Sequence, residues 1–246
     1  MMIKSEQEIS IMAEAGKKLK FVLTELRKAV KPGITTLDLN TLAERLIIEQ
    51  GAKVSFKGYQ GYPFTLCTSV NEEVVHTFPS DRILEEGDII SLDLGLIWQG
   101  WQSDSAITVG VGKIAEEAER LLRITEESLW KGIAQVKPGN TVGDIGAAVQ
   151  EHAEKAGYGV VRALTGHGIG TKLHEPPAIP NFGKKHKGMS LQEGMVIAVE
   201  PMITMGHYNV DIDPKHWTVK TKDGSLAAHF EHTIAIIKNG HKVLTA

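Results

Sequence analysis

The chain has 246 residues, of which 42% are hydrophobic and 23% charged, and its formal net charge is −3. This is the balance of an ordinary globular protein with a sizeable core, and it gives no reason to expect direct binding of nucleic acid. Cys67 is the only cysteine, which excludes a disulfide framework and a cysteine-based zinc site. No signal peptide and no apolar run of membrane-spanning length is present, so we expect a cytoplasmic protein.

The first predicted elements are two helices separated by a Pro-Gly break. Residues 5–30 carry apolar side chains at helical spacing, and Lys31-Pro32-Gly33 ends this pattern. A second helix is predicted over residues 36–50, with Thr35 or Thr36 as its N-cap. The second half of the chain repeats this plan, with helices predicted from about 115 to 136 and from 141 to 155.

Strand signals follow each pair of helices. Residues 88–97 and 103–111 are apolar and alternating, and residues 98–102 between them indicate a hairpin turn. In the second half the predicted strands are residues 195–204, 217–222 and 231–237, whereas residues 58–63 and 174–177 are predicted as ordered loops. Paired helices followed by hairpins, twice over, favour an α+β fold in which an antiparallel sheet is covered on one face by helices.

The chain also repeats itself once. Val30-Lys31-Pro32-Gly33 recurs 106 residues later as Val136-Lys137-Pro138-Gly139, and the same offset relates Thr35 to Thr141 and Asp38 to Asp144. Two copies are too few for a solenoid. We therefore predict a single domain over residues 1–246, built from two pseudo-equivalent halves of about 1–112 and 113–246 that share one sheet.

Each half contains two carboxylates within apolar strand sequence. Asp93 and Asp104 flank the predicted turn at similar distances, so we expect them directly across from each other on neighbouring strands. Glu200 stands 107 residues after Asp93 in a similar apolar run, and Glu231 precedes another. Ionised carboxylates in such strands are costly unless they are paired or bind metal, and no matching lysine or arginine is visible there.

A histidine in a glycine-rich segment completes the candidate site. His167 lies within Gly166-His167-Gly168-Ile169-Gly170, where backbone crowding is low. Any one of the four acids alone is more often a bulge, edge or ion-pair residue than a metal ligand. Four related carboxylates and one imidazole together predict an oxygen-rich site for two divalent ions, which would lower the pKa of a shared water.

Other histidines have two interpretations on position alone. His76 and His174 each lie where an apolar run meets a loop, shortly before a proline, and a loop histidine is as good an interpretation as a catalytic one. His229 and His232 flank Glu231. They could orient Glu231 as a metal ligand, but a histidine that is simply packed or exposed in a strand is the more common case.

These motifs, in this order, resemble the type I methionine aminopeptidases over nearly the whole chain. The five segments are Ser91-Leu92-Asp93-Leu94-Gly95, Asp104-Ser105-Ala106, Gly166-His167-Gly168-Ile169-Gly170, Val199-Glu200-Pro201-Met202 and Phe230-Glu231-His232-Thr233. The resemblance implies the duplicated pita-bread α+β fold with pseudo-two-fold symmetry. It also implies two divalent ions and removal of the initiator methionine from nascent chains, favouring a small second residue.

The resemblance also implies a role for each site residue. Asp93 and Asp104 would chelate one ion, Asp104 and Glu231 would bridge, and His167 and Glu200 would complete the other site. Glu200 would also be the general base, His174 would steady the carbonyl oxygen, and His76 the peptide nitrogen near the leaving amine. The implied methionine pocket consists of Phe56, Tyr59, Tyr62, Cys67, Leu173 and Trp217; simple core packing is the alternative for its aromatic members.

The sequence departs from the family pattern around this pocket. Leu173 stands where the family commonly has phenylalanine, and Phe56 where a small residue is frequent. Thr77-Phe78 replaces a usual Gly-Ile, and His229 replaces a common glutamine. All five ligand positions are intact, but the shape of the pocket and the tolerated second residue are not fixed by the resemblance.

Cofactors and partners follow from the same resemblance. The ligand set accepts iron, manganese, cobalt or zinc, and family members also bind a monovalent cation through a loop that Asn71–Glu73 matches. The implied partners are the N-termini of nascent polypeptides; we expect a monomer without membrane or direct nucleic-acid contacts, and whether it acts at the ribosome is left open.

Two other function classes compete with this hypothesis. A prolidase or X-prolyl aminopeptidase shares the ligand set, but such enzymes usually carry an additional N-terminal domain. A non-enzymatic binding protein of the same fold would lose ligands, whereas this chain retains all five ligand-type residues. A purely structural module would need no buried carboxylates.

Overall fold

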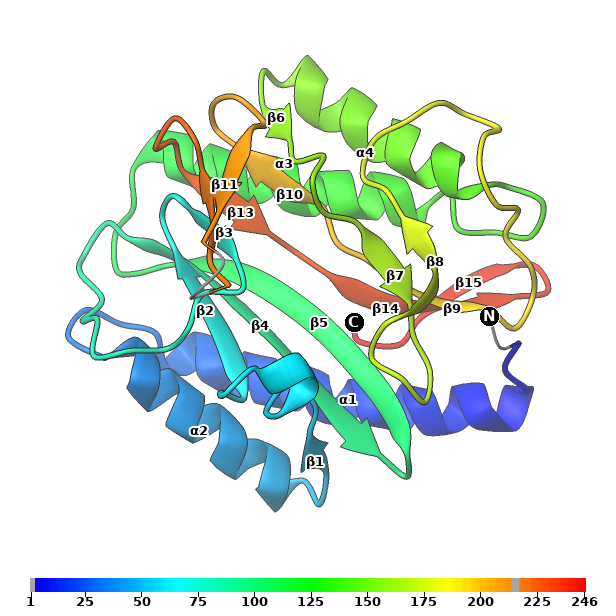
Figure 1. The fold of residues 1–246 in the computed structure, drawn as a ribbon, viewed down its shortest axis with the longest axis horizontal. Helices are drawn as coiled ribbons and strands as arrows, with labels where there is room; N and C mark the ends of the chain where they lie inside the picture. The colour runs from blue at the N-terminus through cyan, green and yellow to red at the C-terminus, as the bar shows by residue number, and fades with distance from the viewer. Residues whose placement is uncertain (1–2, 214–216) are drawn as a thin grey trace.

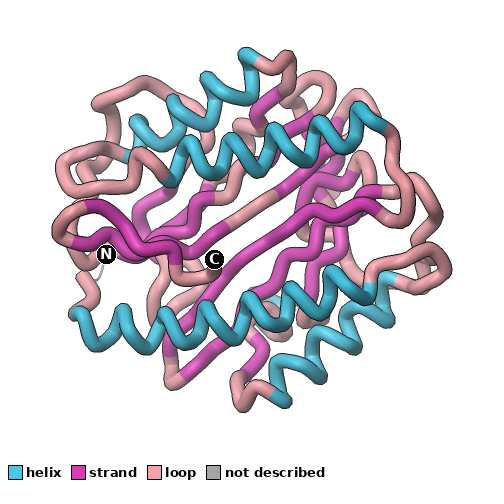
Figure 2. The backbone as a smooth tube through the Cα atoms, turned by 180° about the vertical axis from the view of Figure 1, so that it is seen from behind, coloured by secondary structure: helices cyan, strands magenta, loops and turns pink. Residues whose placement is uncertain are grey.

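The computed structural model describes residues 3–213 and 217–246. Two pairs of helices lie at opposite ends of the molecule in Figure 1, with the strands between them, and Figure 2 shows the helices on one side of the strands. The helices are α1 (Glu6–Ala29), α2 (Thr36–Glu49), α3 (Glu116–Ile133) and α4 (Val142–Lys155). These helices, together with the antiparallel strands, confirm an α+β fold. Each predicted helix is present within about three residues of its expected ends.

Local capping interactions explain why the helices begin where they do. Thr35 accepts a hydrogen bond from the backbone of Asp38, whose side chain accepts one back from the Thr35 backbone. Thr141 and Asp144 form the same reciprocal pair at the start of α4. Such a capping box satisfies backbone N–H groups that the first helical turn leaves without partners. The two positions related by the 106-residue offset therefore use one structural device.

The first half is organised around a long hairpin. The strands are β1 (Lys53–Val54), β2 (Leu66–Val70), β3 (Glu73–Val75), β4 (Ile89–Trp98) and β5 (Trp101–Gly110), with a short 3₁₀ helix η1 at Tyr59–Gly61. β4 is central in the order β1-β4-β2, and β5 also pairs with it. Gln99 and Gly100 both take positive φ, as a tight two-residue hairpin turn requires.

The register of this hairpin corrects one expectation. Asp93 pairs with Ala106, and Asp104 pairs with Gly95. The two aspartates are therefore diagonal neighbours on one face rather than directly opposite, because the turn is centred between Gln99 and Gly100, one residue later than predicted. Diagonal positions still lie within reach of each other.

The second half is more fragmented. Its strands are β6 (Gly159–Val160), β7 (Gly166–Gly168), β8 (Glu175–Ile179), β9 (Val196–Val199), β10 (Met202–Thr204), β11 (Val210–Ile212), β12 (Val219–Thr221), β13 (Ala227–His229), β14 (His232–Ile237) and β15 (Gly240–Val243). They form sheets in the orders β15-β14-β9-β7-β8, β13-β10-β6 and β11-β12-β3.

Three predictions for this half are wrong in detail. The predicted strand 195–204 is interrupted at Glu200, and Glu231 lies in the gap between β13 and β14. Residues 175–177 belong to an edge strand, not a loop, since an edge position tolerates proline.

Hydrogen bonds join the two halves along β5. Ala106 and Glu231 form an isolated antiparallel bridge, in which the Glu231 N–H donates to the Ala106 carbonyl at 2.9 Å. The Thr233 hydroxyl donates to the Asp104 carbonyl at 2.7 Å. β5 and the segment around Glu231, about 130 residues apart in sequence, are thus fixed beside each other, although their strands belong to separately paired sheets.

The chain ends are packed together at α1. Gly16 on this helix faces the backbone of Leu244, and a Cβ at residue 16 would overlap the Leu244 carbonyl. Buried apolar residues of α1, α2 and the β4–β5 hairpin form one large core cluster that includes Leu244. None of the helices in residues 3–213 and 217–246 is long and apolar enough to cross a membrane.

Candidate active site and metal centre

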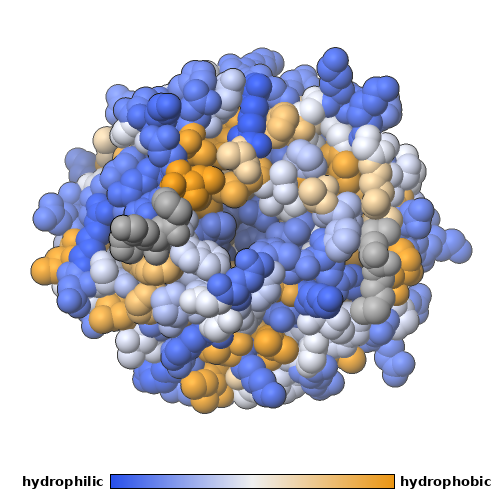
Figure 3. All heavy atoms as spheres, viewed as in Figure 1, coloured by the Kyte–Doolittle hydropathy of each residue, from blue (hydrophilic) through white to orange (hydrophobic). Residues whose placement is uncertain are grey.

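The fold brings all five predicted metal ligands to one cavity of about 280 Å³. Two come from the hairpin, one from β7, and two from the strand breaks of the second half; they are Asp93, Asp104, His167, Glu200 and Glu231. The face shown in Figure 3 is hollowed near its middle, in front of the strands that carry these residues. No lysine or arginine lines the cavity in the described part of the chain.

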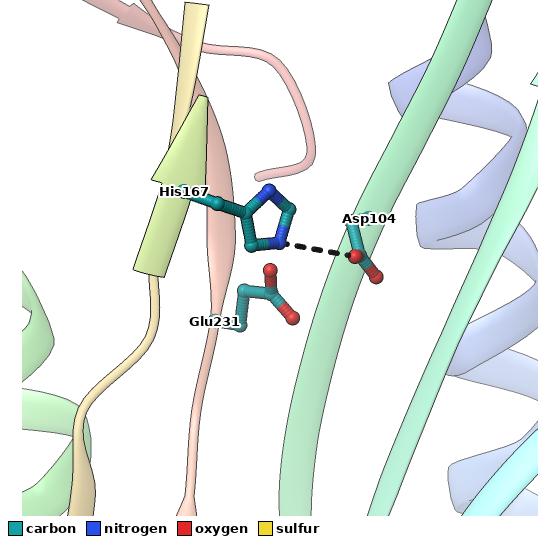
Figure 4. A group of neighbouring side chains, drawn as sticks. All are labelled: Asp104, His167 and Glu231. Carbon is teal, nitrogen blue, oxygen red and sulfur yellow. Dashed lines mark ion pairs between the residues drawn. The ribbon is translucent and has the colours of Figure 1, made fainter. Parts of the chain in front are cut away.

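Three of these side chains already have the spacing of a metal site. One ligand atom each from Asp104, His167 and Glu231 lie within 4.8 Å of one another, and Figure 4 shows the three side chains converging. His167 Nε2 is 3.7 Å from Asp104 Oδ2 and 3.6 Å from Glu200 Oε1. A divalent ion placed among such atoms could bind several of them at once.

His167 is held in the form that binds metal. Its Nδ1 lies 2.9 Å from the Gly168 carbonyl oxygen, which can only accept, so Nδ1 carries the proton. The lone pair of Nε2 then faces the carboxylates. Burial lowers the pKa of His167 to about 3, so the ring is neutral at physiological pH. A neutral imidazole oriented by its other nitrogen is the usual state of a metal ligand.

The carboxylates lack the partners that buried charges need. Oδ1 of Asp93, Oδ1 of Asp104 and Oε1 of Glu231 are buried without hydrogen-bond partners among the described residues. Burial raises the pKa of Asp104 to about 7. Burial, followed by repulsion from neighbouring carboxylates, also raises the pKa of Asp93, Glu200 and Glu231. These orphaned oxygens fit a group that supplies positive charge, and an oxygen-rich set with one imidazole fits a divalent metal ion.

Both predicted substrate histidines line the same cavity. His174 Nδ1 is 2.8 Å from the Tyr59 hydroxyl, and its ring meets that of His167 edge-on at a centroid distance of 4.3 Å. Burial lowers the pKa of His174, and it lowers that of His76 to about 4. His76 takes a positive φ just after β3, a strained conformation for a residue other than glycine. Both rings therefore face the site uncharged.

The six predicted pocket residues also line this cavity, which places Phe56, Tyr59, Tyr62, Cys67, Leu173 and Trp217 beside the ligand set. Tyr62 contacts Phe56 and Trp217 edge-on, at centroid distances of 6.5 and 5.8 Å. Cys67, on β2, pairs with Asp93 on β4, and burial raises the pKa of the Cys67 thiol. The side chains together form an apolar slot that ends at the carboxylates.

Sequence reasoning missed two parts of the site. Gln60 lines the cavity from η1 with a positive φ, and only the flanking Gly58 and Gly61 hinted at an unusual turn. A second hollow of about 320 Å³ shares His76, His167, His174 and Glu200 with the first, and its other lining residues were not predicted as site residues: Val75, Ala163, Leu164, Thr165 and Met202.

Comparisons with known proteins agree with this geometry. The model of "Metallopeptidase family M24" matches residues 10–238. A methionine aminopeptidase of Clostridium acetobutylicum is 50% identical over 244 residues, which cover 99% of this chain and 98% of the relative. The chain belongs to the methionine aminopeptidases of metallopeptidase family M24.

A second sequence relative and a solved structure support the same membership. Methionine aminopeptidase 1 of Bacillus subtilis is 48% identical over 98% of both chains. The crystal structure of methionine aminopeptidase from Rickettsia prowazekii matches with a TM-score of 0.99 at 41% identity, covering each chain fully. A prolidase from Pyrococcus furiosus has a TM-score of 0.78 at 24% identity, and this chain covers only 65% of it, so that likeness shows the pita-bread fold alone. Membership of a metallopeptidase family implies the use of divalent metal.

Proposed function

We propose that this chain hydrolyses the first peptide bond of polypeptides that begin with methionine, using a centre of two divalent ions. The observation that carries the proposal is the direct continuity between the apolar slot and the carboxylate–histidine cluster within one cavity. A thioether side chain suits a narrow aromatic slot, and its peptide carbonyl would then lie over the ligands.

The ligand set divides between the ions as follows. Asp93 and Asp104 would hold one ion, His167 and Glu200 the other, and Asp104 and Glu231 would contact both. The partnerless oxygens of Asp93, Asp104 and Glu231 support this assignment. The ions, when bound, would lower the pKa of a water molecule so that it can act as a nucleophile near neutral pH.

The protein side chains provide the remaining chemistry. Glu200 would take a proton during the attack and return it to the leaving amine, as a general base and then acid. Its side chain is 14% exposed, against 5% for Asp104, so it is the more accessible of the two acids. His174 would donate a hydrogen bond to the developing oxyanion, with Tyr59 fixing its ring, and His76 would contact the peptide nitrogen.

The second hollow would receive residues that follow the methionine. It shares His76 and His174 with the first cavity, together with His167 and Glu200. A side chain next to the scissile bond would have to fit beside the His76 and His174 rings, so a small second residue is expected to be preferred. This preference is a separate part of the proposal.

Several broader assignments belong to the same proposal. The repeat and the paired capping boxes support a single catalytic domain with halves of about 1–112 and 113–246. The protein would work as a cytoplasmic monomer on nascent N-termini. A monovalent cation would bind near Asn71–Glu73, where Asn71 takes a positive φ.

The decisive experiment is hydrolysis of a Met-Gly-Met peptide with iron, manganese, cobalt or zinc, with and without chelator. We expect release of free methionine that depends on metal, and slower release from Met-Leu-Met. Faster cleavage of Leu-initiated or X-Pro peptides would favour the prolidase-like alternative. No methionine release with any of the metals would contradict the proposal and favour a binding protein of the same fold.

A further inference from the structure

Lys4, just before α1, forms a buried ion pair with a residue of the second half. Its Nζ lies 2.9 Å from Glu175 Oε2, and the two side chains are 1% and 9% exposed. The Lys17–Glu14 pair on the same helix is shorter still, at 2.7 Å, but its side chains are 71% and 54% exposed. Exposed pairs contribute little, whereas removing one partner of a buried pair leaves an uncompensated charge.

Glu175 closes the loop that leads from β7 to β8. Its Oε1 accepts a hydrogen bond from the Lys172 N–H at 3.3 Å, while Oε2 faces Lys4. The Gly170 carbonyl accepts from the Gln102 N–H at 2.8 Å, which ties the loop to β5. A Cβ at Gly170 would overlap both the Glu175 carboxylate and the Lys4 side chain, so the paired side chains pack directly against Gly170.

Lys4 is itself fixed by its backbone. Its N–H donates to the Gly194 carbonyl at 2.8 Å, and a Cβ at Gly194 would overlap the Lys4 carbonyl and Ile3. Gly194 precedes β9, the strand that ends just before Glu200. The ammonium group of Lys4 is therefore presented to Glu175 from a rigid position.

The loop held in this way carries two residues of the cavity. Leu173 and His174 both line it, and His174 is directly followed by Glu175. Because adjacent residues share a peptide unit, a shift of the Glu175 backbone after loss of its ion pair would move His174 as well. The loop contains none of the five ligand residues.

We infer that the Lys4–Glu175 ion pair is a positioning device that sets the place of His174 and Leu173 over the reacting peptide bond. This inference rests on the proposed function, since it assigns the pair to the same site. A hydrogen-bond donor misplaced by about 1 Å can cost on the order of 100-fold in rate. Loss of the Lys4–Glu175 ion pair should therefore lower kcat more than it changes KM.

The test compares Lys4→Met and Glu175→Gln with Lys17→Met, which removes an exposed ion pair from the same helix. Methionine release from Met-Gly-Met, bound metal and hydrogen exchange are measured for each full-length variant. We expect kcat to fall at least ~10-fold in the first two variants, with KM changed less than ~3-fold. Bound metal should stay unchanged, exchange should accelerate in residues 170–175, and Lys17→Met should match wild type. Lys4→Arg, which keeps the cation, should recover part of kcat.

Other outcomes would overturn the inference. Unchanged kcat, or unchanged exchange in residues 170–175, would show that the pair positions nothing. Equal loss of protection in β4 and β5 would indicate a general stabilising role. If Lys4→Met does not fold, Glu175→Gln decides, because it keeps the side-chain shape. An inactive wild-type enzyme would contradict the proposed function, whereas the exchange measurement would still decide whether the pair holds the loop.

Discussion

The two halves of the molecule supply acids to one cavity in different ways. Asp93 and Asp104 come from an unbroken hairpin of two ten-residue strands. Glu200 and Glu231 come from gaps between the strands of the second half, where Glu200 follows β9 and only an isolated bridge to Ala106 pairs the Glu231 backbone. A continuous ladder fixes a side chain by its pairing, whereas a break can aim a side chain freely. We interpret the first half as a rigid holder of metal and the second as the source of the more accessible proton-transfer group.

The largest expected effect is a loss of turnover, and metal content then distinguishes metal binding by Asp104 from proton transfer by Glu200. Asp104→Asn should remove metal and lower turnover by at least ~1,000-fold, because the metal contributes several kcal/mol to the transition state. Glu200→Gln, of similar size, should lower turnover comparably but retain more metal, since its main role is to move a proton. Metal analysis beside Met-Gly-Met kinetics measures both. Equal metal loss in the two variants would remove the proposed difference between the halves.

Metal affinity should depend strongly on pH. Burial raises the pKa of Asp104 to about 7 in the protein without metal, so below pH 7 an incoming ion must displace its proton. His167, with a pKa of about 3, stays neutral and does not compete in this range. Each displaced proton should weaken apparent affinity about tenfold per pH unit as pH falls from 7 to 5.

Titration calorimetry of chelator-treated protein in buffers of different ionisation enthalpy would count these protons. The Asp104→Asn variant should release fewer than wild type. Affinity that does not change with pH would mean that the hairpin acids are already ionised without metal.

A moderate effect is expected in the pocket. Leu173→Phe should change kcat/KM for Met-Gly-Met by about 10-fold, the low end of the roughly 10- to 200-fold (about 1–3 kcal/mol) that one methylene in an apolar pocket is worth. A matched change at a second residue of the pocket, Phe56→Leu, should broaden the accepted first residue. Values of kcat/KM for peptides whose first residue is methionine, norleucine or leucine measure both effects. No change in either variant would place the specificity elsewhere in the cavity.

The smallest effect compares the repeated helix starts. Thr35→Ala and Thr141→Ala each remove one capping box, so each should lower the free energy of unfolding by about 1 kcal/mol. Urea denaturation of the two variants measures the difference. Markedly unequal losses would show that equivalent local structure has unequal energetic weight in the two halves.

Local signals in the sequence predicted much of this structure. The helix starts were predictable because Thr35 and Thr141 act on residues three positions away. The convergence of five residues was predictable because buried carboxylates without partners require a common explanation; they are Asp93, Asp104, His167, Glu200 and Glu231. All five line one cavity, although their binding of metal stays a prediction.

What the sequence did not predict depends on distant contacts. The turn was predicted one residue too early because the midpoint between Asp93 and Asp104 set its centre, whereas Gln99 and Gly100 take the positive φ of the turn. β8 was missed because Pro176 and Pro177 weaken its strand signal, and only its position at a sheet edge permits it. The contact between Lys4 and Glu175 spans 171 residues and leaves no local pattern.

The contact between Gly16 and Leu244 has a consequence for how the protein is made. Helix α1 is synthesised before every other element in the described part of the chain, yet the surface around Gly16 is completed by Leu244. Contacts of such sequence separation form late and at high entropic cost. A nascent copy that lacks Leu244 would leave this face of α1 uncovered, so α1 should reach its native packing only after Leu244 has been synthesised.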